Sequence, residues 1–133
     1  MADRYGFQFT KTLVPETFLL DGYLTVGVSG AVTSASLPIW MASITRNSTG
    51  NYTVVLTDLW VSLTSVHVDT LADNDPTDVT ICKVVSKTPG SVSGTTTTAA
   101  QFVFQVTSGG SAADPQNNGA LMFDLNVKNS NSL

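Results

Sequence analysis

The stretch 72–78 (ADNDPTD) holds the side chains of this chain best suited to bind a metal ion. Asp73, Asp75 and Asp78 supply carboxylates at a spacing similar to the start of a calcium loop. An EF-hand also requires glycine at its sixth position and a bidentate glutamate at its twelfth, but Asp78 and Val84 stand there, which excludes an EF-hand. Two interpretations stay open: a looser oxygen-ligand site, or a solvated turn whose side chains cap their own backbone. We favour the turn and expect no metal.

Cys82 and His67 are the single cysteine and the single histidine of the chain. A nucleophilic thiol needs a base beside it, and the only histidine is His67, whose distance from Cys82 does not follow from the sequence. Cys82 lies in the apolar run VTICKVV, which favours a buried, inert thiol. A single cysteine also excludes an internal disulfide.

Other catalytic patterns are missing from the sequence. Glu16 is the only glutamate, and the aspartates fall mostly in turn-forming stretches, so no pair of carboxylates stands out as acid and base. There is no Gly-x-Ser-x-Gly elbow, no phosphate-binding loop and no Cys-x-x-Cys pair. We therefore expect no catalytic residue, no cofactor and no enzymatic activity.

Charge is scarce in this chain of 133 residues: charged residues make up 12% and the net charge is −4. The six cations are scattered, so we expect no binding to nucleic acid, which needs clustered cations. The N-terminal sequence MADRYGFQFTKTL has no apolar signal core, and no apolar run is long enough to cross a bilayer. We expect a protein made in the cytoplasm that binds no membrane.

The elements that position these residues are predicted to be strands. The clearest is 52–57, where Tyr52, Val54 and Leu56 share one face and alternate with polar or smaller residues, after a turn at 47–50. Similar alternation or apolar character predicts further strands at 5–9, 19–28, 39–46, 65–71, 79–85, 99–106 and 121–127. In 65–71 we expect Val66 and Val68 to point inward and His67 and Asp69 outward. In 121–127 one face carries Leu121, Phe123, Leu125 and Val127, and the other carries Met122, Asp124 and Asn126.

Turn-forming residues separate these strands at 72–77, 88–94 and 108–118, and one helical turn is predicted at 57–63 with Asp58 as its cap. Many short strands punctuated in this way are typical of an all-β protein, an antiparallel β-sandwich with little or no helix. A jelly roll and a simpler sandwich share this signal, so the strand order stays open. We expect one domain, with 19–133 forming the sandwich and 1–18 forming an N-terminal arm or first strand.

Several large aromatic residues stand out as contact residues. Tyr5, Phe7 and Phe9 are too apolar to leave in water, which favours their docking onto another surface. Trp40 and Trp60 border predicted strands, and we interpret them as core or interface anchors rather than as a sugar-binding platform. A surface poor in charge suits a protein packed against other subunits, although many secreted β domains share it.

The sequence around GNYTVVLTDLWVSLTSVHV resembles small structural proteins encoded among the virion genes of tailed bacteriophages. The pattern Gly-x-Tyr-Thr-Val-x-Leu-x-Asp-x-aromatic-x-x-Leu is matched by Gly50, Tyr52, Thr53, Val54, Leu56, Asp58, Trp60 and Leu63. The upstream runs VGVSGAVTSAS and ASITRNSTG and the terminal VKNS are similar too. These residues are largely structural, so they indicate a fold family more directly than a role.

The resemblance implies a head decoration or cement protein on the capsid surface of the virion, with the major capsid protein and further copies of itself as partners. Such a protein clamps capsomers, and a homotrimer suits the three-fold positions between them. On this hypothesis Arg4, Tyr5, Phe7 and Phe9 belong to a contacting arm, and Trp40 serves subunit packing.

Two alternatives stay open. One is a tail or head-fibre β module of a phage. The other is a β-sandwich that binds carbohydrate or a host surface through Trp40 or Trp60, with calcium held by the acidic stretch.

Overall fold

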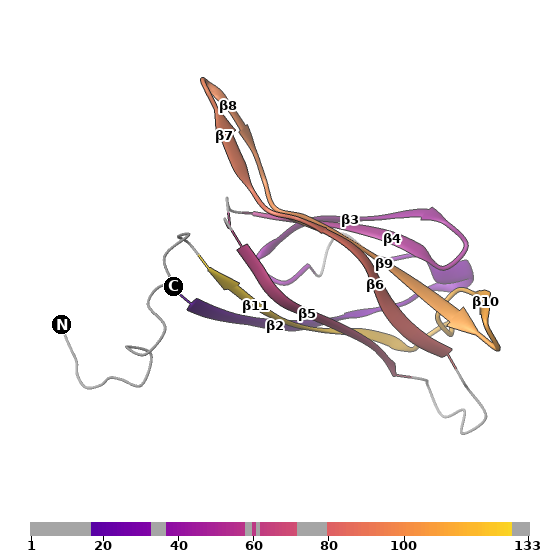
Figure 1. The fold of residues 1–133 in the computed structure, drawn as a ribbon. Helices are drawn as coiled ribbons and strands as arrows, with labels where there is room; N and C mark the ends of the chain where they lie inside the picture. Colours follow the sequence, from indigo (N-terminus) through magenta and orange to yellow (C-terminus); the bar gives the residue numbers. More distant parts are fainter. Residues whose placement is uncertain (1–16, 33–36, 58–59, 61, 72–79, 129–133) are drawn as a thin grey trace, which may run out of the picture.

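The computed structural model describes residues 17–32, 37–57, 60, 62–71 and 80–128. These residues form two antiparallel sheets packed face to face (Figure 1), so the predicted all-β sandwich is confirmed. The only helical element in the described part is the 3₁₀ turn η2 (Val28–Gly30).

The first sheet has the order β3 (Met41–Ser48), β4 (Asn51–Leu56), β9 (Gln101–Ser108) and β6 (Thr80–Thr88), and the short β10 (Ser111–Ala112) pairs with the end of β9. The second sheet has the order β2 (Thr17–Thr25), β11 (Ala120–Lys128) and β5 (Ser62–Leu71). The strands β5 and β6 belong to different sheets but lie side by side, where the Thr70 hydroxyl donates to the Thr80 carbonyl at 3.1 Å.

The core lies between the sheets and follows the alternation of the sequence. Tyr52 and Val54 of β4 stand opposite Phe104 and Phe102 of β9, and all four are fully buried. The ring of Phe123, from β11 of the second sheet, meets Phe104 edge to face at 5.9 Å. The predicted inward faces of 52–57 and 121–127 are thus confirmed, since Leu121, Leu125 and Val127 are also buried.

Several segments differ from the sequence prediction. The strand predicted at 19–28 ends at Thr25, and Val28 begins η2, while the strand predicted at 39–46 begins at Met41. The helical turn at 57–63 is wrong in its described part, because Ser62 and Leu63 begin β5. The stretch 88–94 is not only a turn: Thr88 ends β6, and β7 (Ser91–Ser93) pairs with β8 (Thr96–Thr98) in a hairpin. Proline and glycine punctuate this segment, but its Ser, Val and Thr residues are compatible with an extended ribbon. The stretch 108–118 likewise contains β10.

The expected arm or first strand, 1–18, is described only at its end. Thr17 and Phe18 are the first residues of β2 and pair with Lys128 and Val127. Residues 1–16 lie outside the described residues, as does the acidic stretch 73–78.

Candidate functional site

The outer face of the second sheet carries large apolar side chains that no described element covers. Leu19 and Tyr23 of β2 are 64% and 67% exposed, and Met122 of β11 and Leu71 of β5 are also exposed. They point outward because Leu20, Leu24, Phe123 and Val68, at the alternate positions, face the core. Contiguous apolar side chains on rigid strands are typical of a binding surface.

Acidic side chains run across the same face. Asp21 of β2 lies directly opposite Asp124 of β11, which lies directly opposite His67 of β5. The His67 Nε2 atom is 3.8 Å from a carboxylate oxygen of Asp69. Like charges on directly opposed positions destabilise a sheet slightly. An open depression on this face is lined by Leu19, Asp21, Gly22, Tyr23, His67, Asp69, Met122, Phe123 and Asp124. We call the outward-facing side chains of this set, together with Leu71, the acidic outer face.

Trp40, which is buried beneath this face, holds the backbone of β2 at Asp21. Its indole Nε1 donates to the backbone carbonyl of Asp21 at 2.7 Å, and its ring meets Phe123 edge to face at 5.9 Å. Gly22 lets Pro38 pack closely beside this contact, because a Cβ atom at position 22 would lie 2.7 Å from the Pro38 side chain. The position of Asp21 is therefore set by the packing of Trp40.

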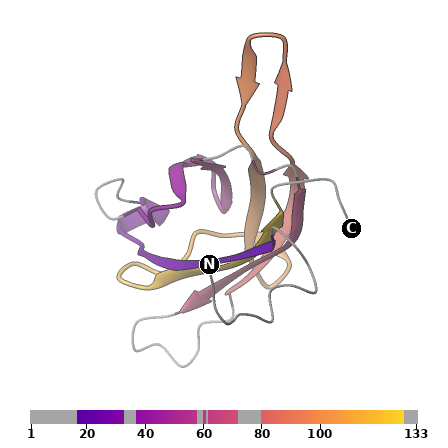
Figure 2. The ribbon, with the colours of Figure 1, turned by 90° about the vertical axis from the view of Figure 1, so that its left-hand side faces the viewer.

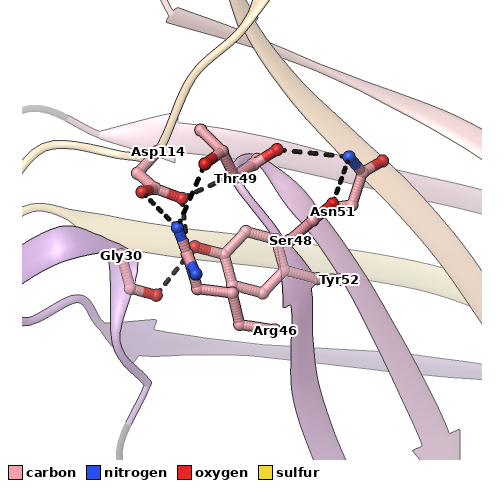
Figure 3. A network of polar contacts seen from close by, with 8 residues as sticks. Gly30, Arg46, Ser48, Thr49, Asn51, Tyr52 and Asp114 are labelled. Atoms are coloured by element: carbon pink, nitrogen blue, oxygen red, sulfur yellow. Dashed lines mark hydrogen bonds and ion pairs between the residues drawn. The ribbon is translucent and has the colours of Figure 1, made fainter.

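A second charged cluster, at one end of the first sheet, is arranged in the opposite way (Figure 3). The Arg46 guanidinium donates to both carboxylate oxygens of Asp114, at 2.9 and 2.7 Å, and the Gly50 backbone N–H donates to the same carboxylate at 2.9 Å. The Tyr52 hydroxyl donates to the Gly30 carbonyl at 2.7 Å. We call Gly30, Arg46, Gly50, Tyr52 and Asp114 the polar lock.

The polar lock shifts the ionisation of its members. The hydrogen bonds from Arg46 lower the pKa of Asp114, and the same contact raises the pKa of Arg46. Burial, helped by the charge of Asp114, raises the pKa of Tyr52 to about 12. Each group is thus held in the protonation state that its hydrogen bonds require.

The turn beneath the lock explains why it forms. Residues 49 and 50 connect Ser48 to its partner Asn51, as expected for the predicted turn at 47–50. Gly50 has φ +71°, and a Cβ atom there would lie 2.5 Å from the Val106 carbonyl oxygen. Only glycine fits this position, and its backbone N–H is then aimed at Asp114.

The β7–β8 hairpin projects away from both sheets, as Figure 2 shows. Its strand residues are exposed, including Val92. No charged residue occurs between positions 88 and 100. At its base the Gly90 N–H donates to the Trp60 carbonyl at 2.7 Å. A two-stranded ribbon without a layer beneath it is marginal by itself, so it is suited to contact another surface.

The predicted contact residues fall into two groups. Arg4, Tyr5, Phe7 and Phe9 lie outside the described residues. Trp40 is only 6% exposed and belongs to the core of its own chain. The contact that the structure assigns to it is therefore within the subunit.

The remaining candidates for chemistry are not brought together. Cys82 packs partly buried against the core, and burial raises its pKa to about 12, which opposes a thiolate nucleophile. His67 is exposed on the acidic outer face, and no hydrogen bond joins it to Cys82 within the described part of the chain. The described residues contain no group of three His, Cys, Asp or Glu able to hold a metal ion. None of the described helical segments is long and apolar enough to span a membrane.

The acidic outer face is the feature that sequence reasoning missed. Its signal is present in β2, where TFLLDGYLT has apolar residues on both faces, whereas a strand with one wet face would alternate. The alternation of Met122, Asp124 and Asn126 opposite the core was predicted. The pairing of Asp124 with Asp21 and of Met122 with Tyr23 depends on the register between β11 and β2, which the sequence does not reveal.

Comparisons of this chain with protein families, with curated proteins and with solved structures found no match.

Proposed function

We propose that this chain is a virion structural protein, a decoration or cement protein that binds the outside of an icosahedral phage head and stabilises capsomer contacts. One observation carries the proposal: the acidic outer face holds Leu19, Tyr23, Leu71 and Met122 exposed on rigid strands. Such a surface favours binding to protein, because covering it removes apolar area from water.

The role requires a rigid scaffold and contacts repeated over many copies. The core of the sandwich supplies the scaffold, and the β7–β8 hairpin supplies a projection able to reach a neighbour. Each copy that bridges two capsomers makes its second contact at high effective concentration, so weak contacts add up to a strong clamp. In this proposal the partners are the major capsid protein and the chain itself as a homotrimer, and the location is the capsid surface.

The test is binding to purified phage heads that lack the protein. We expect the purified chain to co-sediment with these heads, to saturate them, and to raise the temperature at which they release DNA. Isolated tails serve as the control that separates a head decoration protein from a tail component. Absence of co-sedimentation, together with unchanged heat resistance, would refute the proposal.

A carbohydrate-binding β-sandwich is a second candidate, and one observation favours it. Tyr23 is exposed beside the carboxylates of Asp21 and Asp124, and sugars are commonly bound by an aromatic ring with acidic hydrogen-bond acceptors nearby. The platform expected at Trp40 is disfavoured, because that ring is buried. A glycan array decides this candidate: it requires binding that the Tyr23→Ala variant loses.

A further inference from the structure

We propose that copies of this chain bind one another through two matched strips, one on β2 and one on β6. The strip on β2 is Leu19, Asp21 and Tyr23, and the strip on β6 is Ile81, Lys83 and Val85. The number of copies, three, rests on the proposed function, and the inference adds the surfaces through which these copies meet.

The β6 strip is an apolar–basic–apolar series. Ile81 and Val85 are 64% and 57% exposed, and Lys83 is exposed between them. They point outward because Cys82 and Val84 face the core. Such apolar exposure on an outer strand is a liability unless a partner covers it.

Lys83 is also a cation without a described partner. Among the other described cations, Arg46 is bound by Asp114, and Lys87 donates to the Leu63 carbonyl at 3.0 Å. No ion pair or hydrogen bond joins Lys83 to any residue that the structure describes. Its ammonium group is therefore available to a carboxylate of another molecule.

The β2 strip has the same spacing with the opposite charge. Leu19, Asp21 and Tyr23 stand at alternate positions, and so do Ile81, Lys83 and Val85 in the sequence. The register of β6 against β9 shifts between Val84 and Ser86, so Val85 lies in a bulge, with its side chain exposed. The β2 strip spans four residue steps, or about 13 Å, and the β6 strip has a similar length. When the β2 strip of one copy faces the β6 strip of another, Lys83 lies against Asp21. The apolar side chains of the two strips then meet on both sides of this ion pair.

The neighbour of Asp21 strengthens this match. Asp124 lies directly opposite Asp21, so two carboxylates repel each other on one face. An ammonium group from a second copy would sit between them and relieve the repulsion. Covering the flanks with Ile81 and Val85 would also exclude water, which strengthens the ion pair.

The two strips lie on different sheets, so the contact joins unlike surfaces. Contacts between unlike surfaces repeat from copy to copy and close into a ring when the rotation permits. A ring of three copies gives the homotrimer of the proposed function.

The test is the molar mass of the full chain by size-exclusion chromatography with light scattering. We expect wild type to give a multiple of the 14.0 kDa chain mass. Lys83→Glu and Asp21→Lys should each raise the dissociation constant on the order of a hundredfold and give monomers. The double variant, which swaps the two charges, should recover the oligomer. Thr45→Glu on β3 adds the same carboxylate at an exposed position outside both strips and should keep the wild-type mass.

Circular dichroism and thermal unfolding confirm that each variant is folded. A monomeric wild type, an oligomer that survives Lys83→Glu, or a double variant that stays monomeric would each overturn the inference. Binding to phage heads is measured on the same samples. If Lys83→Glu stays oligomeric and the chain still binds heads, the contact between the two strips is refuted but the decoration function is not. If all variants give the expected masses but the chain does not bind heads, only the decoration function is refuted.

Discussion

The polar lock and the acidic outer face use the same kinds of side chain in opposite ways. In the lock, Asp114 receives three hydrogen bonds, from Arg46 and Gly50, and its charge is matched within the chain. On the outer face, Asp21 and Asp124 stand opposite each other without a cation between them in the described part of the molecule. One cluster is satisfied by the fold, and the other is left open.

This difference separates structural charge from charge available for binding. A carboxylate that fastens a turn to a distant loop stabilises the fold, and losing it should destabilise the protein. A carboxylate beside another carboxylate costs stability, so its presence needs a reason outside the single chain. Variants in the two regions should therefore change stability with opposite signs.

The largest effect is expected at the turn of the lock. Gly50→Ala should lower the free energy of unfolding by about 3 kcal/mol, because φ is positive and the new Cβ would lie 2.5 Å from the Val106 carbonyl oxygen. Urea unfolding followed by circular dichroism measures the change. Gly94→Ala is the matched control, with φ +62° and nothing within 4 Å of a Cβ, so it should cost only the conformational strain, about 1 kcal/mol. Equal losses would show that the close approach at Gly50 is unimportant.

Removing the charge of the lock should have the next largest effect. Asp114→Asn should lower the free energy of unfolding by about 1.5 kcal/mol near neutral pH, a value reduced from a buried ion pair because both side chains are partly exposed. Its effect should also depend on pH. The folded pKa of Asp114 lies below the ordinary 3.8, so the unfolded chain takes up the proton first.

The stabilisation by Asp114 is thus fully present well above pH 3.8 and is lost as the pH falls through the lowered pKa. Melting temperatures of wild type and Asp114→Asn should differ at about pH 6 and converge at low pH. A difference that stays constant across this range would show that the charge of Asp114 does not matter.

A smaller effect is expected from the hydroxyl of the lock. Tyr52→Phe should cost about 1 kcal/mol, since the Gly30 carbonyl loses a buried donor at 2.7 Å. The pKa of Tyr52 is raised to about 12 from 10.0, so the unfolded chain loses its proton first as the pH rises. The stability difference between wild type and variant should therefore be constant below pH 10.0 and shrink toward pH 12, as measured by urea unfolding.

The lock and the outer face also mark how far the sequence alone could lead. The turn at 47–50 and the inward positions of Tyr52, Val54 and Leu56 follow from local alternation and turn residues, and they were predicted. The bond from Arg46 to Asp114 joins residues 68 positions apart. Local periodicity carries no information about such a pair.

The outer face shows the same limit. Alternation indicated that Asp124 and His67 point away from the core, but only the register of β2, β11 and β5 brings Asp21, Asp124 and His67 into one row. The β7–β8 hairpin was missed for another reason. Its proline and glycines suggested a turn, whereas cross-strand pairing extends the ribbon of β6 and β9.

The smallest effect is expected from the row of carboxylates, and its sign is the sharpest test of the comparison. Asp124→Asn should raise the stability of the dissociated chain by a few tenths of a kcal/mol, because it removes repulsion with Asp21. Thermal unfolding is measured at low protein concentration, where association between copies adds least to the apparent stability, so the change reports the repulsion within one chain. The gain should shrink in high salt, which screens exposed charges, whereas the loss in Gly50→Ala should persist because its origin is steric. A destabilised Asp124→Asn chain would mean that Asp124 has a partner within the fold, like Asp114, and the contrast between the two regions would fail.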